Sequence, residues 1–223
     1  MENDSEGRER LLRLGVRHLP VLVKGEQLLS SKNMEFIAEF AGLRGIGHIP
    51  LPPQELFEKW ITILRAAQRY ACQLPNDQMN LRALQIRNRP TWQLGNHIFS
   101  IGLAYLECVV GGAKNLTDLQ KTFQSFESDR FTSGEEIARY GDEVIVKIEQ
   151  WWNGLADKSC RRSIEIDNYG VMSVHQLLDR CTWHSAHHAR QIADLLESQG
   201  IEPDGKFSEH DLAGLPLPKR IWD

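Results

Sequence analysis

The sequence predicts a mainly helical protein, a four-helix bundle preceded by a small unit made of a β-hairpin and one helix. Two observations support this prediction. After residue 53, apolar residues recur every three or four positions in four long stretches, as they do on one face of an amphipathic helix. Before residue 44, the apolar runs are short and are separated by turn signals. The 223 residues, 41% of them hydrophobic, suffice for one large domain with a small attachment.

Residues 1–43 are predicted to form a strand-strand-helix unit. The apolar run of residues 19–23 favours a strand, and the turn signal Lys24-Gly25-Glu26 favours a hairpin with residues 27–29 as the returning strand. Residues 33–43 show the apolar spacing of an amphipathic helix. Residues 44–53 hold two glycines and three prolines, which predicts a linker.

The first two bundle helices are predicted at residues 54–73 and from about residue 91. Pro75 stops the first helix. Thr91 is a plausible N-cap of the second helix, which Gly111 and Gly112 end.

The other two bundle helices each begin with a capping-box pattern. Ser133 followed by Glu136 opens the third helix, which runs to about residue 154. Ser173 followed by Gln176 opens the fourth, which ends near residue 199 with Gly200 at its C′ position. The four predicted helices occupy residues 54–202. Residues 203–223 show no periodicity and are predicted to form an extended tail over the surface.

Composition and charge exclude several classes of function. The sequence has 26 lysines and arginines against 30 aspartates and glutamates, a net charge of −4. No strong positive field is available for a phosphate backbone, so we expect no nucleic-acid partner. The most apolar stretch, residues 98–113, is too short to span a bilayer and contains Glu107, so we expect no membrane partner. The N-terminus lacks the pattern of a signal peptide, which predicts a cytoplasmic protein.

The four cysteines are widely separated and contain no Cys-x-x-Cys pair. This spacing excludes a zinc ribbon and a dithiol redox motif. In a reducing compartment such cysteines are most often small buried hydrophobes. We interpret all four in this way: Cys72, Cys108, Cys160 and Cys181.

Three histidines form a candidate metal site. In a helix, His184 and His188 lie one turn apart, about 40° around the axis and about 6 Å along it, so both imidazoles can reach one divalent ion. His97 is the candidate third ligand because it lies on the apolar stripe of its helix, where a polar group needs a partner. Two alternatives stay open. His97 alone could be a hydrogen-bonded core residue, and the residues around His184 could form an exposed polar face.

Two further polar residues lie next to this candidate site. His187 points about 60° away from His184, and we interpret it as a residue behind the ligands or on the surface. Gln191, one turn beyond His188, is the best candidate for a polar group near the ion. No general base or nucleophile of protein origin is predicted, so the catalytic residues are unknown.

A family resemblance supports the same three ligands. The run His184-Ser-Ala-His187-His188-Ala-Arg-Gln191 resembles the last-helix signature of the DinB/YfiT-like four-helix bundle superfamily, and Asn96-His97-Ile98 resembles its second-helix histidine. The resemblance implies a divalent metal ion, most often zinc or nickel, bound by His97, His184 and His188. Members include transferases and isomerases that use mycothiol, bacillithiol or glutathione, and many others have no known activity. Ala189 and Arg190 depart from the usual Arg-Gly pair before the glutamine.

The N-terminal segment resembles the C-terminal half of a glutaredoxin, a partial thioredoxin-like unit. Residues 14–25 and 37–43 carry the similarity, and Leu19-Pro20 occupies the place of the cis-proline dipeptide. In a glutaredoxin the backbone there pairs with the cysteine part of glutathione, so the resemblance implies Leu19 and Pro20 as thiol-binding residues. No cysteine precedes Cys72, which excludes dithiol redox catalysis by this segment. The alternative is a packing or dimerisation element.

These observations lead to three functional hypotheses. The first is a metal-dependent enzyme that activates a low-molecular-weight thiol, such as glutathione, for transfer to a small electrophile or for its isomerisation. Trp92 and Trp183 would wall its apolar substrate pocket, unless both are plain core residues. The second is a non-catalytic metal-binding or interaction module, in which the bundle forms a homodimer and the ion is structural or regulatory. The third is a metal-free scaffold whose histidines make only hydrogen bonds.

Overall fold

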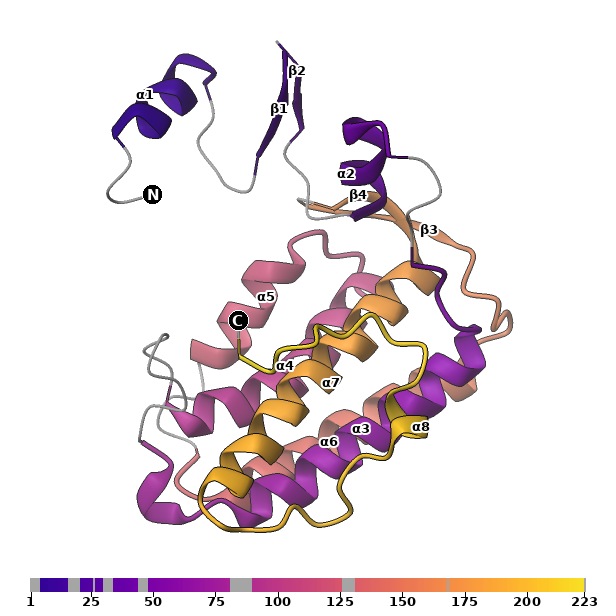
Figure 1. Cartoon of the computed structure of the whole chain (residues 1–223). Helices are drawn as coiled ribbons and strands as arrows, with labels where there is room; N and C mark the ends of the chain where they lie inside the picture. The colour runs from indigo at the N-terminus through magenta and orange to yellow at the C-terminus, as the bar shows by residue number, and fades with distance from the viewer. Residues whose placement is uncertain are drawn as a thin grey trace. The chain divides into compact units, whose positions relative to one another are not determined.

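The computed structural model of the chain is mainly helical, as predicted (Figure 1). It describes residues 5–15, 21–25, 27–29, 34–43, 48–80, 90–125, 131–167 and 169–222. Its contacts divide the chain into two units, residues 1–49 with 165–171 and residues 50–164 with 172–223. The first division, between residues 49 and 50, falls inside the predicted linker of residues 44–53. The assignment of residues 165–171 to the first unit was not predicted.

The N-terminal residues contain the predicted hairpin and helix. Their elements are α1 (Ser5–Arg13), β1 (Leu22–Lys24), β2 (Gln27–Leu29) and α2 (Met34–Ala41). The two strands are antiparallel, with Leu22 opposite Leu29, and the left-handed backbone of Gly25 (φ +60°) makes the turn between them. Helix α1 was not predicted. Leu19 and Pro20, the proposed thiol-binding residues, lie outside the described residues.

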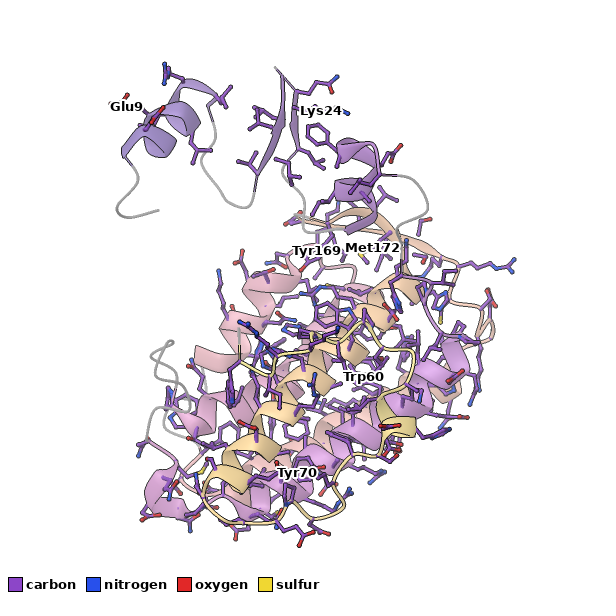
Figure 2. All side chains as sticks on the ribbon, in the orientation of Figure 1. Glu9, Lys24, Trp60, Tyr70, Tyr169 and Met172 are labelled. Carbon is purple, nitrogen blue, oxygen red and sulfur yellow. The ribbon has the colours of Figure 1, made fainter. Side chains whose placement is uncertain are left out.

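Four long helices make up most of the second unit, and their bounds agree with the predicted ones to within a few residues. They are α3 (Pro53–Gln73), α4 (Thr91–Val109), α6 (Gly134–Gly154) and α7 (Val174–Ser198). Helices α3 and α4 each pack against both α6 and α7. A Cβ atom on Gly102 would lie 2.9 Å from side-chain atoms of Val144 and Ile148, so this glycine permits the close approach of α4 to α6. Figure 2 shows Trp60 and Tyr70 of α3 within the packed side chains; both are fully buried.

The helix ends follow the predicted caps with two exceptions, at α6 and α4. At the start of α6 the side chain of Ser133 accepts from the backbone N–H of Glu136, but the Glu136 carboxylate accepts from the backbone N–H of Thr132 at 2.7 Å, so this capping box is incomplete. The side chain of Ser173 accepts from the backbone N–H of Gln176, and the Gln176 side chain accepts in return from the backbone of Ser173, so the capping box of α7 is complete. Gly200 adopts φ +75° beyond the end of α7. Thr91, predicted as an N-cap, is instead the first residue of α4, because Pro90 is the capping residue.

Several shorter elements lie where no structure was predicted. They are the 3₁₀ turn η1 (Asn76–Gln78), α5 (Leu116–Ser125), β3 (Ser163–Ile166) and β4 (Gly170–Ser173), which pairs with β3. Helix α5 packs against α4 and buries Leu116 completely. The alternation in Ser163-Ile-Glu-Ile is a period-two signal that could have identified β3. Among the described residues, none of the helices is both long and apolar enough to cross a membrane.

The C-terminal tail packs along α3 and α7. It contains a short helix, α8 (Glu209–Leu212). The Nζ atom of Lys59 donates to the carbonyl of His210 at 2.6 Å, and the hydroxyl of Tyr70 donates to the carbonyl of Gly205 at 3.1 Å. These hydrogen bonds go to backbone atoms of the tail, which explains how a segment without hydrophobic periodicity is held in place.

Candidate metal centre

The structure brings His97, His184 and His188 together. One candidate ligand nitrogen of each side chain lies within 4.8 Å of the other two. The ring centroid of His97 lies 5.2 Å from that of His184 and 4.7 Å from that of His188. A tetrahedral ion with bonds of about 2.1 Å separates its ligand nitrogens by about 3.4 Å, and three nitrogens within 4.8 Å of one another lie near that spacing. The cluster could therefore bind a metal ion.

Helical geometry accounts for this convergence. His184 and His188 lie one turn apart on α7, and their ring centroids are 4.8 Å apart. Helix α4 packs against α7 and supplies His97 from the same buried face that carries Ile98 and Ile101. The side chains of His97 and His188 are each only 6% exposed, whereas His184 is more accessible. The cluster is therefore an interior feature, which argues against the alternative of an exposed polar face.

Gln191 lies directly behind His188. Its side-chain Oε1 atom lies 2.7 Å from Nδ1 of His188, and its Nε2 atom lies 3.2 Å from Nε2 of His187 and 3.0 Å from the carbonyl oxygen of Ile221. Nδ1 of His188 is therefore engaged by the glutamine, and Nε2 is the ring nitrogen that could bind an ion. His187 contacts Gln191, so the two residues predicted near the ligands lie in one hydrogen-bonded group with His188.

Arg180 contacts His184, which was not predicted. Its Nη1 atom lies 3.3 Å from Nδ1 of His184. A guanidinium group only donates hydrogen bonds, so Nδ1 of His184 acts as an acceptor in this arrangement. Ion binding at His184 requires Arg180 to move away from Nδ1. If Nδ1 binds the ion, its lone pair is no longer available to Arg180. If Nε2 binds the ion, Nδ1 must carry the proton and cannot accept from Arg180. The four-residue spacing of the pair on one helix is the signal that could have identified this contact.

The electrostatic environment favours the neutral form of His184. Burial lowers the pKa of His184 well below its usual value, and the neighbouring His188 and Arg180 lower it further. Only a neutral imidazole has a lone pair for a metal ion. No proton therefore has to be displaced from His184 near neutral pH, and the donor chemistry of the cluster fits a divalent ion of the zinc type.

The two tryptophans proposed as pocket walls lie in different surroundings. Trp92 is buried in α4, at 8% exposure, as expected of a core residue. Trp183 is partly exposed, and its ring centroid lies 5.7 Å from that of its neighbour His184. Trp183 therefore remains a candidate for a wall beside the cluster.

The cysteines do not join the cluster, and the prediction that all of them are buried was wrong for one. Cys108, Cys160 and Cys181 are buried, but Cys72 is exposed on the solvent side of α3. Burial raises the pKa of Cys181 to about 12. A thiol must lose its proton to bind a metal or to attack an electrophile, so Cys181 is a packing residue near neutral pH.

No protein-family model, no curated protein sequence and no solved structure matches this chain.

Proposed function

We propose that this chain is a DinB-like four-helix bundle that binds one divalent ion, zinc or nickel, through His97, His184 and His188. The observation that carries the proposal is the convergence of three imidazoles from α4 and α7 within 4.8 Å, in surroundings that keep His184 neutral. Among the described residues, the group contains three candidate ligands and not the four of a closed structural site. Three protein ligands are typical of catalytic zinc sites, in which the remaining position takes water or substrate.

The activity that we propose is activation of a low-molecular-weight thiol of the glutathione type for transfer to, or isomerisation of, a small electrophile. A divalent ion lowers the pKa of a bound thiol and so supplies a thiolate near neutral pH. The chain's own residues would orient the site: Gln191 holds Nδ1 of His188, and Trp183 forms an apolar wall near the open position. Cys181 is not the nucleophile, because its pKa of about 12 keeps it protonated.

A second candidate function is a structural ion in a non-catalytic metal-binding or interaction module. The observation in its favour is burial, since His97 and His188 are each only 6% exposed and the chain's C-terminal residues lie against Gln191 behind them. A structural site is closed to solvent and exchanges no ligand. Access of a small molecule to the ion therefore separates the two functions.

Two consecutive experiments test the proposal: measurement of the metal content, and then spectroscopy of the cobalt-substituted protein. Protein prepared without a histidine tag should contain about one divalent ion per chain by elemental analysis, since the described part of the chain provides one group of three ligands. The cobalt-substituted protein is then titrated with glutathione, bacillithiol and mycothiol, with the S-methyl derivative of each as the control. Thiolate ligation adds a sulfur-to-cobalt charge-transfer band. We expect this band in wild type with at least one of the three thiols and with none of the S-methyl controls. We expect no such band in His97→Ala.

The outcomes distinguish the two functions from a metal-free scaffold. A cobalt spectrum that no thiol changes would contradict thiol activation and favour the structural ion. Protein that neither contains nor takes up a divalent ion would contradict both, leaving the histidines as hydrogen-bonded core residues.

A further inference from the structure

We propose that residues 218–222 determine which ring nitrogen of the candidate ligand His188 carries the proton. We call these residues the C-terminal strap. The strap acts through Gln191, which we assign as a positioning residue for His188. This inference rests on the proposed metal-binding function, but its first readout is made on the metal-free protein.

Three side chains of α7 hold the strap. Arg190 donates to the carbonyl of Pro218 at 3.1 Å, Gln191 donates to the carbonyl of Ile221 at 3.0 Å, and the indole N–H of Trp222 donates to Asp194 at 2.6 Å. Figure 1 shows the yellow C-terminal segment crossing α7. The three contacts lie within five residues of one helix, so the strap is attached where α7 also carries the candidate ligand His188.

The carbonyl of Ile221 determines how the Gln191 amide is oriented. A backbone carbonyl only accepts hydrogen bonds, so it must face the NH₂ group of the glutamine and not its oxygen. The opposite orientation would place two acceptor oxygens against each other. With NH₂ toward Ile221, the amide oxygen faces Nδ1 of His188, as observed at 2.7 Å.

The orientation of Gln191 in turn sets the tautomer of His188. An amide oxygen has no proton to donate, so Nδ1 of His188 must be the nitrogen that carries hydrogen. Nε2 then keeps its lone pair for the ion. A histidine that binds metal through one nitrogen commonly donates the other N–H to an oxygen acceptor, which fixes the tautomer and raises the basicity of the ligand. Here that acceptor is held by the last residues of the chain.

A second glutamine provides a matched comparison. Gln73, near the end of α3, also bonds the tail backbone: it donates to the carbonyl of Glu202 and accepts from the N–H of Asp204, both at 2.8 Å. No described hydrogen bond joins Gln73 to the histidine cluster. Of these two glutamines, Gln191 is the one that connects the tail to a candidate ligand by a hydrogen bond between described residues.

The test reads the His188 tautomer in metal-free protein by two-bond ¹⁵N–¹H NMR of the imidazoles, and the zinc affinity by competition with a chelator. In wild type we expect the Nδ1–H form of His188. Gln191→Leu should mix the two tautomers and weaken zinc binding by about 10- to 100-fold, the range for residues that orient a ligand. Removal of residues 218–223 should shift both readouts in the same direction. Gln73→Leu should change neither.

A conservative variant separates positioning from packing. In Gln191→Glu the carboxylate still accepts from Nδ1–H, so the tautomer of His188 should remain that of wild type, although the amide N–H groups for Ile221 and His187 are lost. If the shortened chain does not fold, the double variant Arg190→Met/Trp222→Phe keeps the full length and loosens the strap at both ends. We expect the same direction of change in it.

Different results overturn the inference and the proposed function. A wild-type tautomer and an unchanged zinc affinity in both Gln191→Leu and the strap variants would overturn the inference, even if zinc binds wild type tightly. Failure of wild type to bind zinc would overturn the proposed function, and the NMR comparison would still decide whether the strap sets the tautomer.

Discussion

Cys181 and His184 lie three residues apart on α7, and the same physical cause acts on them in opposite directions. Burial raises the pKa of Cys181 to about 12 and lowers the pKa of His184 well below its usual value. In both cases burial disfavours the charged form of the side chain. For the thiol the charged form is the metal ligand, and for the imidazole the neutral form is the ligand.

The comparison explains why the candidate centre consists of histidines although cysteines lie buried in the same helices. The buried Cys108 on α4 and Cys181 on α7 occupy elements that also supply ligands. A metal ion would have to remove a strongly held proton from Cys181, whereas His184 offers its lone pair at neutral pH. Experiments that change either the cysteines or the histidine cluster test this difference between thiol and imidazole.

The largest expected effect concerns thiol reactivity. A pKa of about 12 against the ordinary 9.0 reduces the thiolate fraction of Cys181 about 1,000-fold near neutral pH, and burial blocks access in addition. Native protein treated with iodoacetamide and analysed by peptide mass spectrometry should be labelled first at the exposed Cys72. Cys72→Ser is the control and should remove that rapid labelling. Labelling of native Cys181 as fast as Cys72 would show that the first half of α7 is not closed to reagents.

The next effect in size is the loss of a ligand. His188→Ala should weaken zinc binding more than about 100-fold, beyond the range for residues that only orient a ligand, because two imidazoles hold an ion far less tightly than three. Chelator competition measures the affinity. The exposed His210 is the matched control, and His210→Ala should bind zinc like wild type. Equal affinities in the two variants would remove His188 from the centre.

The pH dependence of stability follows from the lowered pKa of His184. Above about pH 6.5 the residue is neutral in both folded and unfolded chains and contributes no pH dependence. As the pH falls below that value, the unfolded chain takes up a proton that folded His184 does not. The free energy of unfolding of the metal-free protein should therefore decrease, by at most about 1.4 kcal/mol per pH unit from this residue, until the pH reaches the folded-state pKa.

Urea unfolding of metal-free protein between pH 5 and 8 measures this dependence. His184→Gln cannot take up the proton, so its stability should fall less steeply than that of wild type below pH 6.5. Parallel curves for the two proteins would mean that folded His184 titrates like an ordinary histidine.

The smallest expected effect is a gain in zinc affinity. Arg180→Met removes both the donor that occupies Nδ1 of His184 and a positive charge beside the ion. Partly exposed charges interact by about 0.2 to 1 kcal/mol, so zinc should bind about 1.4- to 5-fold more tightly. The control is Arg65→Met, which changes the net charge equally but loses an ion pair with Glu149 at 3.0 Å. The gain should shrink at high salt. Weaker binding in Arg180→Met would show that Arg180 supports the ion.

The periodic parts of the chain were predictable, and the reason is local. Helical periodicity and caps predicted α3, α4, α6 and α7, because a helix repeats its face every 3.6 residues wherever it lies. The same rule placed His184 and His188 on one face. Helix α5 and the β3–β4 hairpin were missed although Leu116 and the Ser163-Ile-Glu-Ile alternation carry short signals of the same kind. Short elements depend more on packing than on their own pattern.

Sequence by itself determined that one helix turn presents two imidazoles and that a third histidine, His97, lies on an apolar stripe. Only the tertiary structure decided that α4 packs on α7 so that the three rings meet, that Arg180 contacts Nδ1 of His184, and that the carbonyl of Ile221 orients Gln191. Most of the tail's hydrogen bonds to α3 and α7 go to its backbone carbonyls, and every residue, proline included, carries a carbonyl. Apart from the indole of Trp222, which bonds Asp194, the side chains of the tail therefore give little indication of where it binds.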